Sequence, residues 1–231
     1  MSSTALHPSS PAAVATAQEA GLAQGRAAPG LLLIACLLVL VTCGAYVMAG
    51  PQAAMPAGAS SLDAARAATA GAGGWMLLAC WAGIPGDALL TVASLMLAQR
   101  AAAPGLRAGW IMVALVGAVF LGVDTMVGQV LPPLAAATQA EGAYLAARTL
   151  FDALFHMGTF IGGVGALMVA WSSVQRPRVW GTWLGGSGLL AVLAGAAGLL
   201  GWGWWLATGA AVTMMVAALA GWGWAGFRSA H

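Results

Sequence analysis

The sequence predicts an all-α integral membrane bundle of about six transmembrane helices. Of its 231 residues, 61% are hydrophobic and only 6% are charged, and the mean hydropathy is +0.89. A soluble domain carries about 25% charged residues, so this chain could not cover a water-facing surface. Apolar runs of ~20 residues recur along it, each long enough to cross ~30 Å of hydrocarbon as a helix. These runs are continuous rather than alternating, which argues against a transmembrane β-barrel.

Residues 30–227 form the predicted transmembrane domain. Its six spans cover residues 31–49, 74–98, 108–130, 149–171, 180–200 and 204–227. Residues 1–29, rich in Ala, Ser, Pro and Gln, predict a flexible cytoplasmic tail, and residues 228–231 predict a short second one. Arg26 before the first run also fits a secretory signal. The apolar stretch lies mostly beyond Cys36, however, which favours a retained first helix.

Cap and breaker residues set the boundaries between these spans. Ser61 and Asp63 in the first outer connection predict the start of a short interfacial helix, because their side chains can accept from free first-turn amides. Pro85, within Gly83-Ile84-Pro85-Gly86, predicts a break near the middle of the second span. Pro132-Pro133 predicts the end of the third span, since proline opposes helix continuation. Residues 134–148 then form a second polar connection.

The arginines predict the orientation of the bundle. With the amino terminus inside, six arginines fall in inner segments and only two, Arg66 and Arg148, fall in outer ones. This is the asymmetry that the positive-inside rule expects, and the tryptophans gather at the same predicted span boundaries. We therefore predict that both termini are cytoplasmic. The richness in Ala and Gly without any lysine indicates a high-GC bacterial gene, and so a multi-pass protein of the bacterial inner membrane.

Composition excludes several classes of function. All eight basic residues are arginine, so Schiff-base chemistry, which needs a lysine amine, is ruled out. A net charge of +2 is too small and too scattered for nucleic-acid binding. Cys36, Cys43 and Cys80 all fall within predicted spans, which argues against a disulfide framework or a redox pair.

Four ionisable residues within the spans are the candidate site residues: Asp87, Asp124, Asp152 and His156. An Asp at the centre of a membrane helix costs about 2.5–3.5 kcal/mol, so such groups normally face the bundle interior and find a partner. They are the candidates for a ligand or proton pathway.

Predicted depth divides these four residues. Counted from the outer boundary at 1.5 Å per residue, Asp152 lies ~5 Å deep, Asp124 ~9 Å and His156 ~10 Å, whereas Asp87 lies ~20 Å deep. Asp152 and His156 are four residues apart and share one helix face. We therefore predict an outer polar cluster of Asp124, Asp152 and His156, with Asp87 apart from it beside Pro85.

Several interpretations of this cluster remain open at this point. It could serve packing alone, or it could form a proton or cation pathway or a polar pocket open to the outside. A third interpretation is an intramembrane metalloenzyme with Asp124, Asp152 and His156 as ligands, and a fourth is a quinone or pigment held by His156. The sequence leaves the activity and any cofactor unknown. A small membrane protein that binds or passes a ligand or proton, or that supports a larger assembly, is the leading hypothesis, and an enzyme is the alternative.

The fifth span is dense in glycine, with Gly181, Gly185 and Gly188 on one face. Small residues at such spacing allow close helix approach. This face predicts either packing within the bundle or contact with a membrane-protein partner or second copy, and we favour packing.

The arrangement of spans and two segments resemble a known family. The turn Arg176-Pro177-Arg178-Val179-Trp180-Gly181-Thr182-Trp183-Leu184-Gly185 and the preceding Phe160-Ile161-Gly162-Gly163-Val164-Gly165-Ala166-Leu167-Met168 are similar to those of domain-of-unknown-function family 4386, a group of six-span bacterial membrane proteins. The resemblance extends over roughly residues 30–227. It implies the fold and a membrane location but no activity and no functional residues.

Overall fold

The computed structural model describes residues 11–50, 61–172, 178–202 and 205–228, giving the backbone alone for 11–26, 178 and 205. These described residues contain no strand. The helices are α1 (Pro11–Ala49), α3 (Leu62–Gly71), α4 (Gly73–Arg100), α5 (Pro104–Thr125), the π-helical turn η2 (Met126–Val130), α6 (Leu131–Ala136), α7 (Glu141–Ser172), α8 (Arg178–Leu199) and α9 (Trp205–Arg228).

Within the described residues, six helical segments are long and apolar enough to cross a membrane. They are Ala27–Ala49, Gly73–Arg100, Pro104–Ala136, Glu141–Ser172, Val179–Leu199 and Leu206–Arg228. The third of these joins α5, η2 and α6 into one continuous span. The predicted all-α bundle of six spans is confirmed.

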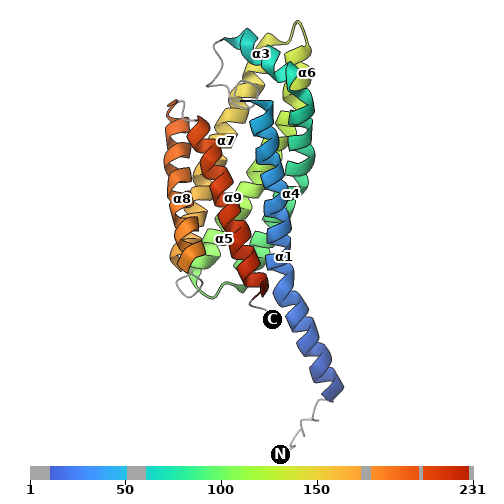
Figure 1. Cartoon of the computed structure of the whole chain (residues 1–231), viewed down its shortest axis with the longest axis vertical. Coiled ribbons are helices and arrows are strands. Elements are labelled where there is room, and N and C mark those ends of the chain that lie inside the picture. Colours follow the sequence, from blue (N-terminus) through green and yellow to red (C-terminus); the bar gives the residue numbers. More distant parts are fainter. Residues whose placement is uncertain (1–10, 51–60, 173–177, 203–204, 229–231) are drawn as a thin grey trace, which may run out of the picture.

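The spanning helices form a closed ring. Each packs against the next in the order α1, α4, α5, α7, α8, α9, and α9 returns to α1. In Figure 1, α1 enters and α9 leaves at one end of this ring, while α3 and α6 cover the opposite end. We call the end that carries α3 and α6 the outer end, following the predicted orientation, and the opposite one the inner end.

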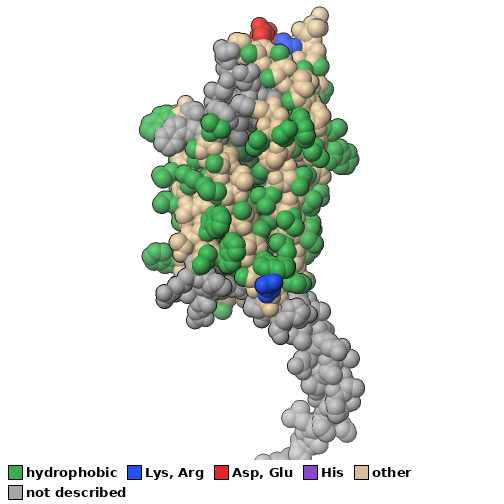
Figure 2. Space-filling view, viewed as in Figure 1, with side chains coloured by type: hydrophobic (Ala, Val, Ile, Leu, Met, Phe, Trp, Pro, Cys, Tyr) green, Lys and Arg blue, Asp and Glu red, His purple; other side chains and the backbone are tan. Residues whose placement is uncertain are grey.

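The wall of the bundle is apolar where lipid would contact it. Leu, Ile and Val side chains such as Ile34, Leu37 and Leu193 are about half exposed along the spans. Figure 2 shows hydrophobic side chains over the whole height of one face, with the described charged ones gathered at its two ends. Exposed tryptophans also mark the two ends, with Trp202 at the outer one and Trp171 at the inner one. This is the distribution expected of a protein whose solvent is a bilayer.

The outer connection contains the short helix that the sequence predicts. Ser61 is the N-cap of α3, and its Oγ accepts a hydrogen bond of 3.1 Å from the amide of Ala64. Helix α3 packs against α6, and Arg66 of α3 donates to the carbonyl of Ala137 at 2.6 Å. The capping prediction at Ser61 is confirmed, and α3 forms part of a folded cover over the outer end.

The prediction that the third span ends at Pro132-Pro133 is wrong. The chain passes from η2 directly into α6, whose first turn holds both prolines. A proline is tolerated in the first turn of a helix, where no amide donor is needed. The π-helical turn supplies the transition, since the amide of Leu131 donates to the carbonyl of Met126, five residues earlier. The span therefore continues to Ala136.

Three other boundaries also differ from their predicted places. Helix α7 begins at Glu141, so most of the predicted polar connection 134–148 is helical. Helix α1 begins at Pro11, because the Ala- and Gln-rich stretch before the first span has high helix propensity. Helix α4 is unbroken and carries Pro85 in its interior. Proline removes one hydrogen bond there, and the packing of α4 between α1 and α5 maintains the helix on both sides.

Several glycines of the fifth span pack against another helix of the same chain. A side-chain carbon at Gly188 would lie 3.0 Å from the carbonyl oxygen of Gly163, and one at Gly195 would lie 2.7 Å from the amide of Phe160. Both neighbours belong to α7, so these glycines let α7 and α8 approach closely. The packing interpretation is confirmed at these two positions. A partner or second copy at the rest of the fifth span stays a prediction.

Candidate functional site

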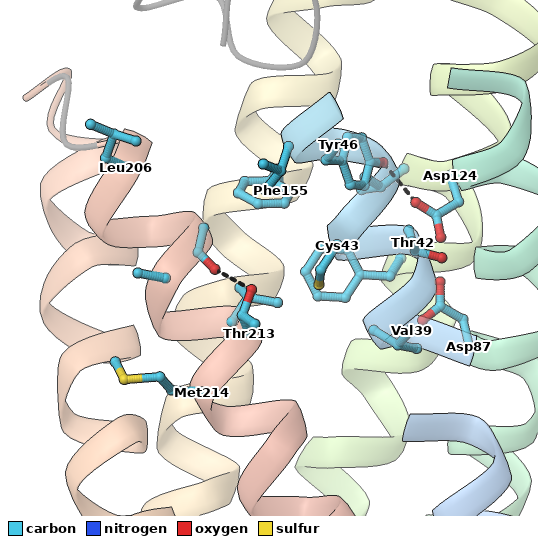
Figure 3. A pocket seen from close by; sticks show the side chains of 16 residues that line it. Val39, Thr42, Cys43, Tyr46, Asp87, Asp124, Phe155, Leu206, Thr213 and Met214 are labelled. Carbon is cyan, nitrogen blue, oxygen red and sulfur yellow. Dashed lines mark hydrogen bonds between the residues drawn. The ribbon is translucent and has the colours of Figure 1, made fainter. Parts of the chain in front are cut away.

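Glycines set the register of α4 against α5 and bring two acidic residues together. Any side chain at Gly83 would collide with the carboxyl group of Asp124. A carbon added at Gly117 would lie 2.7 Å from the carbonyl oxygen of Asp87. With no side chain at either point, the two helices approach closely in antiparallel register. Asp87 of α4 and Asp124 of α5 therefore face each other inside the ring (Figure 3).

The depth of Asp124 explains why it lies with Asp87. Since the third span runs to Ala136, Asp124 lies twelve residues from its outer end, a depth of about 18 Å at the helical rise. Asp87 lies fourteen residues from the start of α4, a depth of about 21 Å. The predicted separation of the two residues was an error in the position of the helix end. Both are buried, with Asp87 1% exposed and Asp124 4% exposed.

A third helix contributes a hydroxyl to this pair. The Oη of Tyr46 on α1 donates to Oδ1 of Asp124 at 2.7 Å. The other close polar neighbour of Asp124 is the carboxyl group of Asp87. Among the described residues no hydroxyl, amide or guanidinium donor reaches Oδ2 of Asp87. We call Tyr46, Asp87 and Asp124 the carboxyl cluster.

The carboxyl cluster brings two acidic side chains together with no cationic side chain among the described residues beside them. Two carboxyl groups can hydrogen-bond only if at least one of them is protonated, and two adjacent carboxylates are strongly disfavoured in a low dielectric. No arginine lies among the described residues around the pair to neutralise it. The cluster therefore combines two acidic groups and one tyrosine hydroxyl deep inside the transmembrane domain.

A cavity of about 520 Å³ borders the carboxyl cluster. Its walls come from α1, α4, α5, α7 and α9, and its described lining is Val39, Thr42, Cys43, Tyr46, Val47, Asp87, Phe120, Val123, Asp124, Phe155, Leu206, Gly209, Ala210, Val212, Thr213 and Met214. Figure 3 shows Tyr46, Asp87 and Asp124 on one wall, with Leu206, Thr213 and Met214 across the space from them. The volume falls in the range of about 300–1,000 Å³ that is typical of small-molecule sites.

The cavity reaches the molecular surface near the outer end, between α1 and α9. Val47 and Leu206, which line it, are 77% and 68% exposed. The two helices are in contact at their inner ends instead, where Gly30 approaches Phe227 and Gly223 approaches Leu32. The mouth therefore lies where α1 ends and α9 begins.

Apolar packing closes the cavity on the inner side. Among the described residues a second space of about 20 Å³ lies next to Asp87, and the rest of its lining is apolar and includes Leu90, Val113 and Leu219. This is room for about one water molecule. Nearer the inner end the rings of Trp110 and Trp222 pack edge to face, 4.8 Å apart, and both are buried. As far as the described residues show, the cavity is open near the outer end and closed by packing toward the inner end.

His156 and Asp152 lie apart from the carboxyl cluster, and the predicted outer cluster with Asp124 does not form. The Nδ1 of His156 donates to the backbone carbonyl of Asp152 at 2.8 Å, because a carbonyl can only accept. The imidazole packs over Gly198 of α8, where any side chain would collide with it. The carboxyl group of Asp152 interacts with the charge of Arg148 one turn earlier on α7.

A second buried polar group lies beneath the outer cover, and the sequence did not indicate it. Nη1 of Arg148 donates to the hydroxyls of Tyr144 at 2.7 Å and Thr69 at 3.2 Å, and these two hydroxyls are 2.8 Å apart. All three side chains are buried. We call Thr69, Tyr144 and Arg148 the arginine cluster. The only sequence feature that could have indicated this cluster is the rarity of tyrosine. The chain has two tyrosines, and each of them hydrogen-bonds an ionisable residue.

No group of three His, Cys, Asp or Glu side chains among the described residues could hold a metal ion. Asp124, Asp152 and His156 are all described, so the structure does not support the metalloenzyme interpretation of that set. Cys36, Cys43 and Cys80 are free thiols. Only Cys43 lines the cavity.

No family model, curated protein or solved structure matches this chain. The resemblance to family 4386 stays a prediction, and the site is interpreted from its own geometry.

Proposed function

We propose that this protein binds small, largely apolar molecules in the cavity, and that the carboxyl cluster exchanges a proton as the cavity fills and empties. We also propose that it does so in a bacterial cytoplasmic membrane with both termini inside, as the arginine distribution indicates.

The juxtaposition of Asp87 and Asp124 with a surface-open cavity carries this proposal. A polar group needed only for packing would be expected to satisfy its atoms with local donors. Oδ2 of Asp87 has no such donor among the described residues, and both carboxyl groups border a space large enough for a ligand. Ionisable groups are costly at this depth, so their place beside an open cavity favours a function over a purely structural role.

Carbene photolabelling tests whether small apolar molecules enter the cavity. The purified protein in phospholipid nanodiscs would be photolysed with 3-trifluoromethyl-3-phenyldiazirine and mapped by peptide mass spectrometry. We expect label on Asp87 or Asp124, because carbenes insert readily into carboxyl O–H bonds and these residues are reached only through the cavity. Label confined to lipid-facing residues such as Ile34 and Val41 would contradict the proposal.

A matched pair of substitutions controls this experiment. Ala210→Trp places a large ring in the cavity lining, so it should strongly reduce the label on the carboxyl cluster. Ala153→Trp makes the same change on the exposed face of α7 and should leave that label unchanged. Equal labelling in both variants would show that the probe reaches the carboxyl groups by another route.

A further inference from the structure

We propose that the ligand of the cavity is a lipophilic organic cation, and that it exchanges with a proton of the carboxyl cluster. This inference rests on the proposed function and names the ligand class of the same site. It depends on the charge, the ring content and the shape of the cavity lining.

The charge of the lining selects a cation. Asp87 and Asp124 are its two acidic residues, and its described residues include no arginine or histidine. The chain has no lysine at all. The other titratable groups that face the pair are the Tyr46 hydroxyl and the Cys43 thiol, both from α1, while α7 and α9 contribute Phe155 and Thr213. An anion would meet no cationic side chain among the described lining residues, whereas a cation would find two carboxyl groups.

The rest of the lining selects an apolar, ring-bearing molecule. Phe120 and Phe155 line the cavity with their rings edge to face and centroids 5.7 Å apart. Tyr46 lies close to Phe155 in Figure 3. Aromatic faces attract organic cations, most strongly where water is excluded. A strongly hydrated metal ion would lose more hydration free energy on entering than contacts with this mostly apolar lining would provide. An organic cation with a delocalised charge and a large apolar surface suits both the acidic pair and the aromatic lining.

Charge balance explains the proton exchange. In an apolar space without a counter-ion the empty pair is most stable with no net charge, which means that both carboxyl groups carry a proton. When a monovalent cation enters, one O–H bond of the pair breaks and the proton leaves through the open mouth. The remaining carboxylate neutralises the cation. The net charge of the cavity is zero before and after, so the low dielectric opposes neither state.

Two ions of the same shape and opposite charge test the inference. Binding of tetraphenylphosphonium and of tetraphenylborate to the protein in nanodiscs would be measured by titration calorimetry in two buffers of different protonation enthalpy. We expect the phosphonium to bind the wild-type protein and to release a proton, because close charge pairs contribute enough energy for about a tenfold preference or more. Equal affinity for the two ions, or phosphonium binding without proton release at any pH, would overturn the proposal.

The double variant Asp87→Asn/Asp124→Asn identifies the groups responsible. Asn keeps the shape of Asp, so the cavity should persist while the preference for the phosphonium and the proton release are both lost. Retained or improved tetraphenylborate binding would show that the variant is folded. Wild-type phosphonium binding in the double variant would overturn the inference. Successful photolabelling of the cluster without cation selectivity would remove this inference and leave the proposed function standing.

Discussion

The arginine cluster and the carboxyl cluster are both buried polar groups built around a tyrosine, yet the first contains a cation and the second contains two acids. In the arginine cluster a donor-rich side chain meets two hydroxyls that can accept, and the group is enclosed beneath α3 and α6. In the carboxyl cluster one hydroxyl donates to a pair of acceptors, and an open cavity lies beside them. Buried hydrogen bonds between helices stabilise a fold, whereas an excess of acceptors beside an open cavity leaves a place for a proton or a cation.

The difference indicates which cluster stabilises the fold and which one takes part in ligand binding. Thr69 comes from α3 and Arg148 from α7, so the arginine cluster holds the outer cover to the bundle. The carboxyl cluster joins α1, α4 and α5 beside the space between α1 and α9. Substitutions in the arginine cluster should reduce stability without altering binding, and those in the carboxyl cluster should alter binding at a smaller cost in stability. Four predictions can break or sharpen this comparison.

The largest expected effect is from Arg148→Ala. It removes a buried guanidinium that donates to two hydroxyls, and hydrogen bonds to charged groups are each worth about 1.5–3 kcal/mol, so we expect a loss of about 3 kcal/mol in unfolding free energy. Unfolding in mixed micelles measures it. Arg100→Ala, at the exposed inner end of α4, is the control and should change stability little. Comparable losses of unfolding free energy in the two variants would show that the arginine cluster does not stabilise the fold.

Gly83→Ala should destabilise by about 1–3 kcal/mol, because the new methyl group would collide with the carboxyl group of Asp124. Gly122→Ala, two residues from Asp124, faces open space and should stabilise α5 by up to about 1 kcal/mol. The same unfolding measurement compares the two variants. If both substitutions change the unfolding free energy in the same direction, the close packing of α4 against the Asp124 side chain is contradicted.

The two tyrosines allow one substitution to be compared across both regions. Tyr144→Phe should cost about 2 kcal/mol, because it removes an acceptor of the buried Arg148. Tyr46→Phe should cost only about 1 kcal/mol, since water in the cavity can replace the lost donor to Asp124. Phosphonium binding should change in Tyr46→Phe and not in Tyr144→Phe. If phosphonium binding changed in Tyr144→Phe and not in Tyr46→Phe, the roles of the two clusters would be reversed.

The smallest expected effect is from His156→Ala. The imidazole packs over Gly198 of α8 rather than lining the cavity, so phosphonium affinity and proton release should stay at their wild-type values. The same preparations should be compared by metal analysis and absorption spectroscopy. A bound metal or chromophore that disappears in this variant would reverse the conclusion and return His156 to the centre of the site.

The sequence identified the four ionisable candidates but not their grouping. Asp87 and Asp124 stood out because an acidic residue inside an apolar span is rare and costly. Their partnership was missed because Pro132-Pro133 resembles a helix end, and that error placed Asp124 too near the surface. Asp152 and His156 do share a face of α7 as their spacing predicts, but the imidazole bonds the backbone of Asp152 rather than its carboxylate.

By itself, the sequence determined the membrane location, the six helical spans and the cap at Ser61, because each depends on local composition or on neighbouring residues. Tertiary structure decided which residues meet. Contact between Asp124 and Asp87 depends on two glycines that set a register between helices, and Tyr46, which bonds Asp124, lies 78 positions away in the chain. The cavity likewise exists only because α1 and α9, the two ends of the chain, close the ring at one end and leave it open at the other.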